Sequence, residues 1–148
     1  MKISTKSRYG LAAITYIAQN SKNGEFITVA NISETLGFSK IYLEQTFSFL
    51  KRAGIVAGVK GAQGGYKLAR EPKDITVFDI LCAIETQLFD DTEKTVERKD
   101  RALEIAMQTK VFQPISNSLK SLLVQITIED LVIEAEKNRT GTEYMYFI

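Results

Sequence analysis

Apolar residues recur at helical spacing through the first third of the chain. Those within 9–17 fall at i, i+3, i+4, i+7 and i+8, and this stripe predicts a helix that Thr5 caps. Thr28 and Ser39 precede two further stripes and are the predicted caps of a second and a third helix, the second ending at Gly37. The residues predicted to face the core are Tyr9, Ala12, Ala13, Tyr16, Ile17, Val29, Ile32, Leu36, Leu43, Phe47 and Leu50.

Two adjacent features predict a winged helix. Only Gly37-Phe38 separates the second helix from the third, which is the spacing of a helix-turn-helix motif, and Gly54 ends the third helix. Short strands are then expected at 55–59 and 66–69, and the glycine-rich stretch 60–65 between them is typical of a hairpin wing. Neither the P-loop motif nor the dinucleotide-binding glycine motif fits this stretch, so the glycines do not indicate a nucleotide site.

The pattern of the chain changes after Pro72. Thr76 and Asp79 have the spacing of a capping box and predict a short helix, which the polar stretch 87–99 follows as a mobile connection. We therefore assign a winged helix-turn-helix DNA-binding domain to residues 1–75. The predicted fold class is mainly α with a small β wing, an α+β winged helix-turn-helix with a long dimerisation helix.

A long helical stripe runs through the second half. Apolar residues three and four apart between 100 and 125 predict one helix, which Pro114 kinks or restarts. A helix that extends so far from a small domain needs a surface to bury its stripe, and a second copy of the chain is the simplest one. We predict a homodimer, with a helical dimerisation and regulatory region at 76–138. A last helix is expected to open at 127–133, before a turn-like polar stretch at 138–143.

The composition excludes several classes of site. The 148 residues suffice for one domain with a helical extension, and 45% apolar with 25% charged residues is ordinary for a globular protein. No apolar run of transmembrane or signal-peptide type is present, so we expect a cytoplasmic protein without membrane contact. One cysteine and no histidine argue against zinc sites, iron–sulfur clusters and histidine-dependent catalysis. We predict no cofactor and no enzyme activity.

Charge is divided unevenly between the two halves. Residues 1–75 carry 11 Lys and Arg against 5 Asp and Glu, whereas residues 76–148 carry 8 against 13. A basic half joined to an acidic half suits a protein that binds a polyanion with the first and proteins with the second.

Polar side chains in the first two turns of the third helix match the base edges of DNA. Gln pairs with adenine, Glu accepts from cytosine N4, and Lys reaches guanine or phosphate. The predicted contacts of this recognition helix are Ser39, Lys40, Tyr42, Glu44 and Gln45, and those of the wing are Lys60, Gln63, Gly64 and Gly65. The predicted phosphate contacts are Lys6, Arg8, Tyr9, Lys51 and Arg52.

Four motifs in the first half resemble the Rrf2 family of bacterial transcription regulators. They are Lys2 to Gly10, Tyr42 to Gln45, Gly61 to Tyr66 and Asp74 to Thr76. The resemblance implies a winged-helix dimer with its recognition helix in the major groove and its wing in the minor groove of a palindromic site. Many relatives carry Arg in the wing where this chain has Lys60, so that contact is expected to be weaker or different.

The family's iron–sulfur sensing is not carried over. Several members sense a cluster or nitric oxide through three cysteines after the fourth helix, and the corresponding stretch here, 85–101, contains no cysteine. The sensor is therefore expected to be something else, with Cys82 as a candidate redox residue.

The C-terminal residues are unusually apolar for a chain end. They either pack as a strand or plug on their own body, or form a tail at 139–148 that binds a partner. The end resembles that of cysteine-metabolism repressors within the family, which implies cysteine synthase as the partner. Serine acetyltransferase inserts a tail ending in Ile into that enzyme's substrate site, and Ile148 is expected to do the same in competition with O-acetylserine. The predicted partner-binding residues are Tyr144, Met145, Tyr146, Phe147 and Ile148.

Three interpretations of function remain open. The first is a repressor of sulfur and cysteine metabolism genes that cysteine synthase controls. The second is an Rrf2-type regulator that senses another ligand or an oxidant. The third is a protein-interaction module that does not bind DNA, in which the basic surface is incidental.

Overall fold

A computed structural model describes residues 3–61 and 64–146 of the chain, and 142–146 as backbone alone. The first half contains α1 (Thr5–Asn20), α2 (Val29–Leu36), α3 (Lys40–Arg52), β1 (Val56–Val59), β2 (Gly65–Leu68), the 3-10 turn η1 (Pro72–Asp74) and α4 (Val77–Ile84). The second half contains α5 (Arg101–Met107), the π-helical segment η2 (Gln108–Phe112), α6 (Gln113–Leu123) and α7 (Ile128–Tyr146). This order confirms the predicted mainly α winged helix-turn-helix with its two-stranded wing.

The ends of the first three helices follow local side-chain chemistry. Thr28 and Ser39 cap α2 and α3 as predicted, each accepting a backbone N–H three residues on. Gly37 ends α2 with a left-handed φ of 73°. The predicted cap at Thr5 is wrong, because Thr5 is already helical and the Ser4 hydroxyl accepts the Ser7 N–H.

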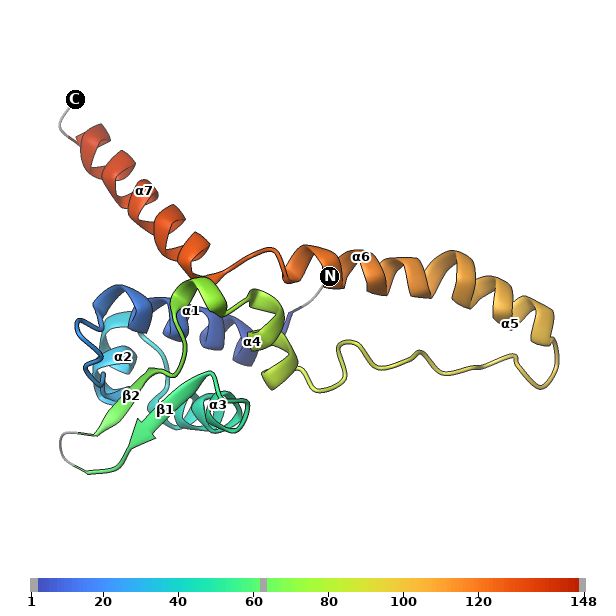
Figure 1. Ribbon diagram of the computed structural model, residues 1–148, viewed down its shortest axis with the longest axis horizontal. Coiled ribbons are helices and arrows are strands. Elements are labelled where there is room, and N and C mark those ends of the chain that lie inside the picture. Colours follow the sequence, from blue (N-terminus) through green and yellow to red (C-terminus); the bar gives the residue numbers. More distant parts are fainter. Residues whose placement is uncertain (1–2, 62–63, 147–148) are drawn as a thin grey trace.

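One core holds the winged domain together, with α1 packed against α3, α4 and α7 (Figure 1). The predicted residues Ala13, Ile17, Ile32, Leu43, Phe47 and Leu50 are fully buried in it. Ile80 of α4 and Ile128 of α7 belong to the same core. The domain boundary after residue 75 stays a prediction, although this core extends beyond it.

The second half forms an arm, which we define as α5, η2 and α6. In Figure 1 the loop 86–100 leads away from the winged domain, and the arm returns alongside it. The predicted helix from 100 to 125 is confirmed in extent, and its irregularity is the π segment just before Pro114. Proline has no N–H and its ring excludes the carbonyl four residues back, so the Gln113 N–H donates to the Gln108 oxygen five residues back.

The last helix is longer than the sequence pattern predicts. Its start is confirmed, since Thr127 and Asp130 exchange capping hydrogen bonds of 2.9 and 3.1 Å. The expected turn at 138–143 is wrong, because α7 continues through Tyr146. Gly141 is the only strong helix breaker in that stretch, and one glycine is tolerated within a helix. Among the described helices, none is long and apolar enough to cross a bilayer.

Candidate nucleic-acid interface

Burial of one face of α3 determines which residues the other face presents. Leu43, Phe47 and Leu50 are inaccessible to solvent, and Ser39 fixes the start of the helix. Ile41, Gln45 and Ser48 are spaced i, i+4 and i+7 on the opposite face, and all three are exposed. We call these three residues the outer ridge. It carries no charge.

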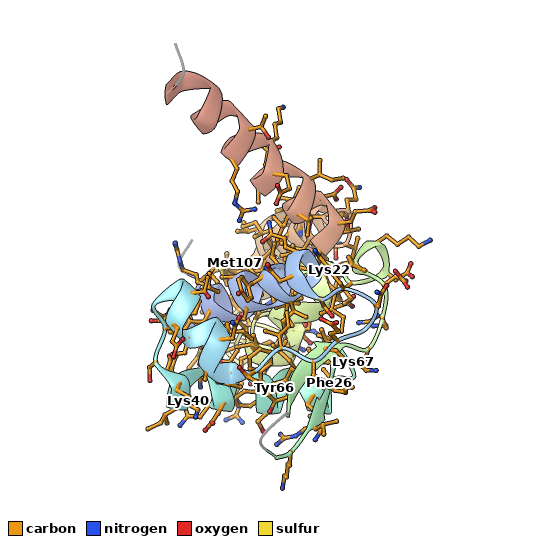
Figure 2. The ribbon with its side chains drawn as sticks, turned by 90° about the vertical axis from the view of Figure 1, so that its left-hand side faces the viewer. Lys22, Phe26, Lys40, Tyr66, Lys67 and Met107 are labelled. Atoms are coloured by element: carbon orange, nitrogen blue, oxygen red, sulfur yellow. The ribbon has the colours of Figure 1, made fainter. Side chains whose placement is uncertain are left out.

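Three lysines lie on the side of the outer ridge that faces the wing. Lys40 and Lys51 of α3 line a groove of about 480 Å³ between α3, the start of α2 and the wing, and Lys60 lies on the wing side of the same groove. We call these lysines the wing-side row. Figure 2 shows Lys40 and Tyr66 along the same lower edge of the molecule. Glu44 also lines this groove and is the one acidic side chain among the residues that do so.

Two cations lie over Phe49, where α3 meets α1: Lys6 comes from α1, and Arg52 follows the outer ridge at the end of α3, four residues after Ser48. The Lys6 Nζ atom is 5.2 Å from the centroid of the Phe49 ring and 5.7 Å from that of Tyr42. The Arg52 guanidinium carbon is 5.8 Å from the Phe49 centroid. We call Lys6 and Arg52 the α1-side pair. Phe49 holds both cations at one place on the surface by cation–π attraction.

The aromatic residues next to this pair belong to the protein's own packing. Tyr9 stacks on Phe38 with centroids 4.0 Å apart, and meets the edge of Tyr42 at 5.2 Å. Both predicted contact residues, Tyr9 and Tyr42, are therefore half-buried in an aromatic cluster. Arg8 is exposed on α1.

The wing is attached to the domain through its second strand. Ile27 and Tyr66 exchange two backbone hydrogen bonds of 2.8 and 2.9 Å and so form an antiparallel bridge between the segment before α2 and β2. The Tyr66 ring stacks on Phe47 with centroids 4.2 Å apart. Burial, and secondly the Glu44 carboxylate, raise the pKa of Tyr66 above its usual value, so its hydroxyl stays protonated.

The predicted wing contacts lie in different environments. Lys60 is exposed, Gly64 is buried, and Gln63 lies outside the described residues. A Cβ atom at Gly64 would lie 2.2 Å from the Val59 carbonyl oxygen, and one at Gly65 would lie 2.2 Å from the Ile27 carbonyl oxygen. Close backbone packing at the base of the wing therefore requires glycine at both positions, whether or not DNA is bound.

Three residues that the sequence does not predict as contacts lie next to the predicted ones. Ile41 and Ser48 lie on the outer ridge, and Phe49 lies beneath the α1-side pair. The helical period already assigns Ile41 and Ser48 to the outside of α3, so sequence reasoning could have found them. No sequence signal pairs Phe49 with Lys6, because 43 positions separate them.

Comparison with known proteins assigns the family. The sequence profile of the Rrf2 family, described as iron-dependent transcriptional regulators, matches residues 3–134. The chain belongs to the Rrf2 family. The regulator CymR of Bacillus subtilis is 35% identical to this Rrf2 chain over 149 aligned residues, which cover the whole of both proteins. IscR of Vibrio atlanticus is 34% identical over 137 residues, which cover 92% of this chain and 78% of IscR.

Solved structures of Rrf2 regulators agree with this assignment. The structure of CymR, the global cysteine regulator of B. subtilis, has a TM-score of 0.73 at 33% identity and covers 90% of this chain and 98% of its own. The structure of T. potens IscR has a TM-score of 0.73 at 36% identity, with coverages of 99% and 96%. The predicted family and winged-helix class are confirmed. These relatives are transcription regulators, a class of protein that is not enzymatic.

The iron named in the family's description does not fit the donor atoms of this Rrf2 chain. Clusters are held by several Cys thiolates, with His in some, and the sequence has one Cys and no His. Within 3–61 and 64–146, no three His, Cys, Asp or Glu side chains form a metal-binding group. No step of the function proposed below passes through iron.

Cys82 lies half-buried in α4. Burial raises the pKa of its thiol, the Asp79 carboxylate raises that pKa further, and Lys120 lowers it by less. Because the thiolate is the reactive form, this environment favours an unreactive thiol over a redox switch.

Proposed function

We propose that this Rrf2 chain is a DNA-binding repressor that acts as a homodimer on a palindromic operator. The observation that carries the proposal is the uncharged outer ridge of α3, which lies between the wing-side row and Lys6 of the α1-side pair. Phosphates border the major groove on both sides, whereas neutral base edges form its floor. A helix of about 10–12 Å diameter fits a groove about 12 Å wide. The positive side chains therefore match the phosphates that border the groove, and the diameter of α3 matches the width of the groove.

Each group of side chains then has a distinct role. Gln45 pairs with adenine, Lys40 reaches guanine or phosphate, and Glu44 accepts from cytosine N4. The proposed phosphate contacts are Lys6, Arg8, Lys51 and Arg52. Lys60 enters the minor groove as a single point charge, without the planar fork of an arginine.

The arm supplies the proposed dimer contact. Leu103, Ile105, Ile115 and Leu122 are each about half exposed or more, at 48%, 54%, 61% and 56%. Ile115 and Leu122 are seven residues apart and share one face of α6, and exposed apolar surface of this kind is stabilised when a second copy covers it. A two-fold dimer presents two α3 helices, which explains why we expect a palindromic operator.

Operator selection from random duplexes tests the proposal. We expect one palindromic sequence to be enriched, with two half-sites about one helical turn or a multiple apart. Titration by fluorescence anisotropy should then give an affinity that falls steeply with salt, because each neutralised phosphate releases a counterion. Enrichment of no sequence, with weak binding to all duplexes alike, would overturn the assignment and favour the protein-interaction module.

We propose further that the repressed genes belong to cysteine and sulfur metabolism and that cysteine synthase is the controlling partner. Two observations support this. The similarity to CymR extends over the full length of both chains, including the C-terminal end. In addition, α7 leads away from the winged domain (Figure 1). The terminal Phe147 and Ile148 lie outside the described residues.

Calorimetric titration with a cysteine synthase from the same organism tests this partnership. The full chain should bind, a variant that lacks Phe147 and Ile148 should not, and O-acetylserine should oppose binding. The matched control is Glu134→Ala, which is exposed on α7 outside the 139–148 tail and should bind as the full chain does. Failure of the full chain to bind would leave a regulator that answers to another ligand or to an oxidant.

A further inference from the structure

The most exposed large apolar side chain among the described residues is on the recognition helix. Ile41 is 71% exposed, above Ile115 at 61% and Ile133 at 59%. A single exposed isoleucine is ordinary on a protein surface, so exposure alone decides nothing. Its position is what matters, because it occupies the first turn of α3 on the outer ridge, beside the exposed polar residues Lys40 and Gln45.

We propose that Ile41 recognises the 5-methyl group of a thymine in each half-site of the operator. This inference rests on the proposed DNA-binding function and adds a base preference to it. The C5-methyl of thymine is the apolar group among the donors and acceptors that base pairs present in the major groove. An exposed apolar side chain on a ridge that faces the groove floor therefore has one matching chemical partner.

The surroundings of Ile41 favour DNA over an apolar protein surface. A protein partner that covered Ile41 would also bury Lys40 and Glu44, which are both exposed and make no ion pair among those of the described residues. Burying such unpaired charges is unfavourable. A DNA groove avoids this penalty, because phosphates lie beside the lysine while base edges meet the isoleucine.

The geometry of the helix also makes Ile41 suited to reading one position. Isoleucine is β-branched, so its χ1 angle is largely fixed within a helix and its methyl groups keep a defined direction. Gln45 follows four residues later, about 6 Å along the axis. That distance corresponds to between one and two base-pair steps of about 3.4 Å. The inferred half-site therefore contains a thymine within one or two steps of the base that Gln45 reads.

The test combines removal of the protein side chain with removal of the DNA methyl group. Each thymine of the selected operator is replaced in turn by deoxyuridine, which deletes only the 5-methyl group. At one thymine per half-site, this replacement should weaken binding by the full chain about 4-fold. That is the change expected when the burial of one methyl group is lost. Ile41→Ala keeps a strong helix former in α3 and should bind the thymine and deoxyuridine operators equally.

Ser48→Ala is the matched control, since it changes the same ridge two turns further along. It should retain the full deoxyuridine effect. The inference is overturned if no deoxyuridine replacement weakens the full chain, or if the loss persists undiminished in Ile41→Ala. Both of these outcomes presuppose specific binding by the full chain, so they are distinct from failure of the proposed function.

Discussion

The winged domain buries the apolar side chains of its helices, whereas the arm leaves many of its apolar side chains exposed. In the described residues 3–61 and 64–84, only Ile41 and Val59 are exposed large apolar side chains. Between Leu103 and Ile133 there are eight. Helices α1, α3 and α4 pack against one another, whereas Ile115 and Leu122 of the arm remain exposed at 61% and 56%. The winged domain thus completes its core within one chain, and the exposed apolar side chains of the arm are the basis of the proposed dimer contact.

The largest expected effect comes from placing a charge on the arm. Ile115→Asp should abolish the dimer and weaken operator binding about 100-fold or more, because one half-site alone no longer gains from the second. Analytical ultracentrifugation and anisotropy titration measure the two changes. Asn117→Asp adds the same charge on another face of α6 and should leave both unchanged. A variant Ile115→Asp that remains a dimer would refute the role given to the stripe.

The next effect tests whether the base of the wing is as tightly packed as the domain core. Gly65→Ala should destabilise the protein by about 1–3 kcal/mol, because the added Cβ meets backbone that pairs with Tyr66. Gly141→Ala makes the same chemical change in α7, where nothing lies within 4 Å, and should stabilise the helix by up to about 1 kcal/mol. Urea unfolding measures both, and equal midpoints for the two variants would contradict the contrast.

A third effect separates two kinds of DNA contact within the winged domain. Gln45→Ala should weaken the binding free energy for the selected operator by about 1–3 kcal/mol and change that for unrelated DNA little. Lys6→Gln should weaken all sequences alike and lower the salt slope by about one, since it removes a phosphate contact. Anisotropy titrations at several salt concentrations distinguish the two. A sequence-dependent loss for Lys6→Gln would move that residue from the phosphates to the bases.

The smallest effect concerns the link between α4 and the start of α1. The Ser4 N–H and the Ser7 hydroxyl donate to the Glu85 carboxylate at 3.0 and 2.8 Å, and these hydrogen bonds lower the pKa of Glu85. The folded state thus favours the ionised carboxylate. Its contribution to the free energy of unfolding is present above the unfolded pKa of about 4.3 and is lost as pH falls through the lower pKa of the folded state. We expect about 1 kcal/mol or less, since the group is partly solvated.

Unfolding of the wild type and of Glu85→Gln between pH 7 and pH 3 checks this sign. The wild type should be the more stable at pH 7, and the difference should shrink as the carboxylate is protonated. A difference that grows on acidification would contradict the assigned hydrogen bonds.

Much of the candidate surface follows from residues that are close in sequence. The exposed positions of Lys40, Glu44, Gln45, Lys51 and Arg52 were predictable, because the burial of Leu43, Phe47 and Leu50 determines the outside of the same helix. The packing roles of Tyr9 and Tyr42 were not predictable, since they depend on Phe38 and on how α1 crosses α3. The continuation of α7 was also missed, because polar composition at 138–143 resembles a turn.

The sequence by itself determined the helices of the winged domain, the caps at Thr28 and Ser39 and the wing hairpin. Those features depend on interactions between residues a turn or a few positions apart, such as Thr28 with the Asn31 N–H. Only the tertiary structure decided which distant groups share a surface: Ile27 with Tyr66, Glu85 with Ser7, and Lys6 with Phe49. The physical reason is that such contacts form only after the chain has closed on its core, so their energies are not encoded in any one local segment.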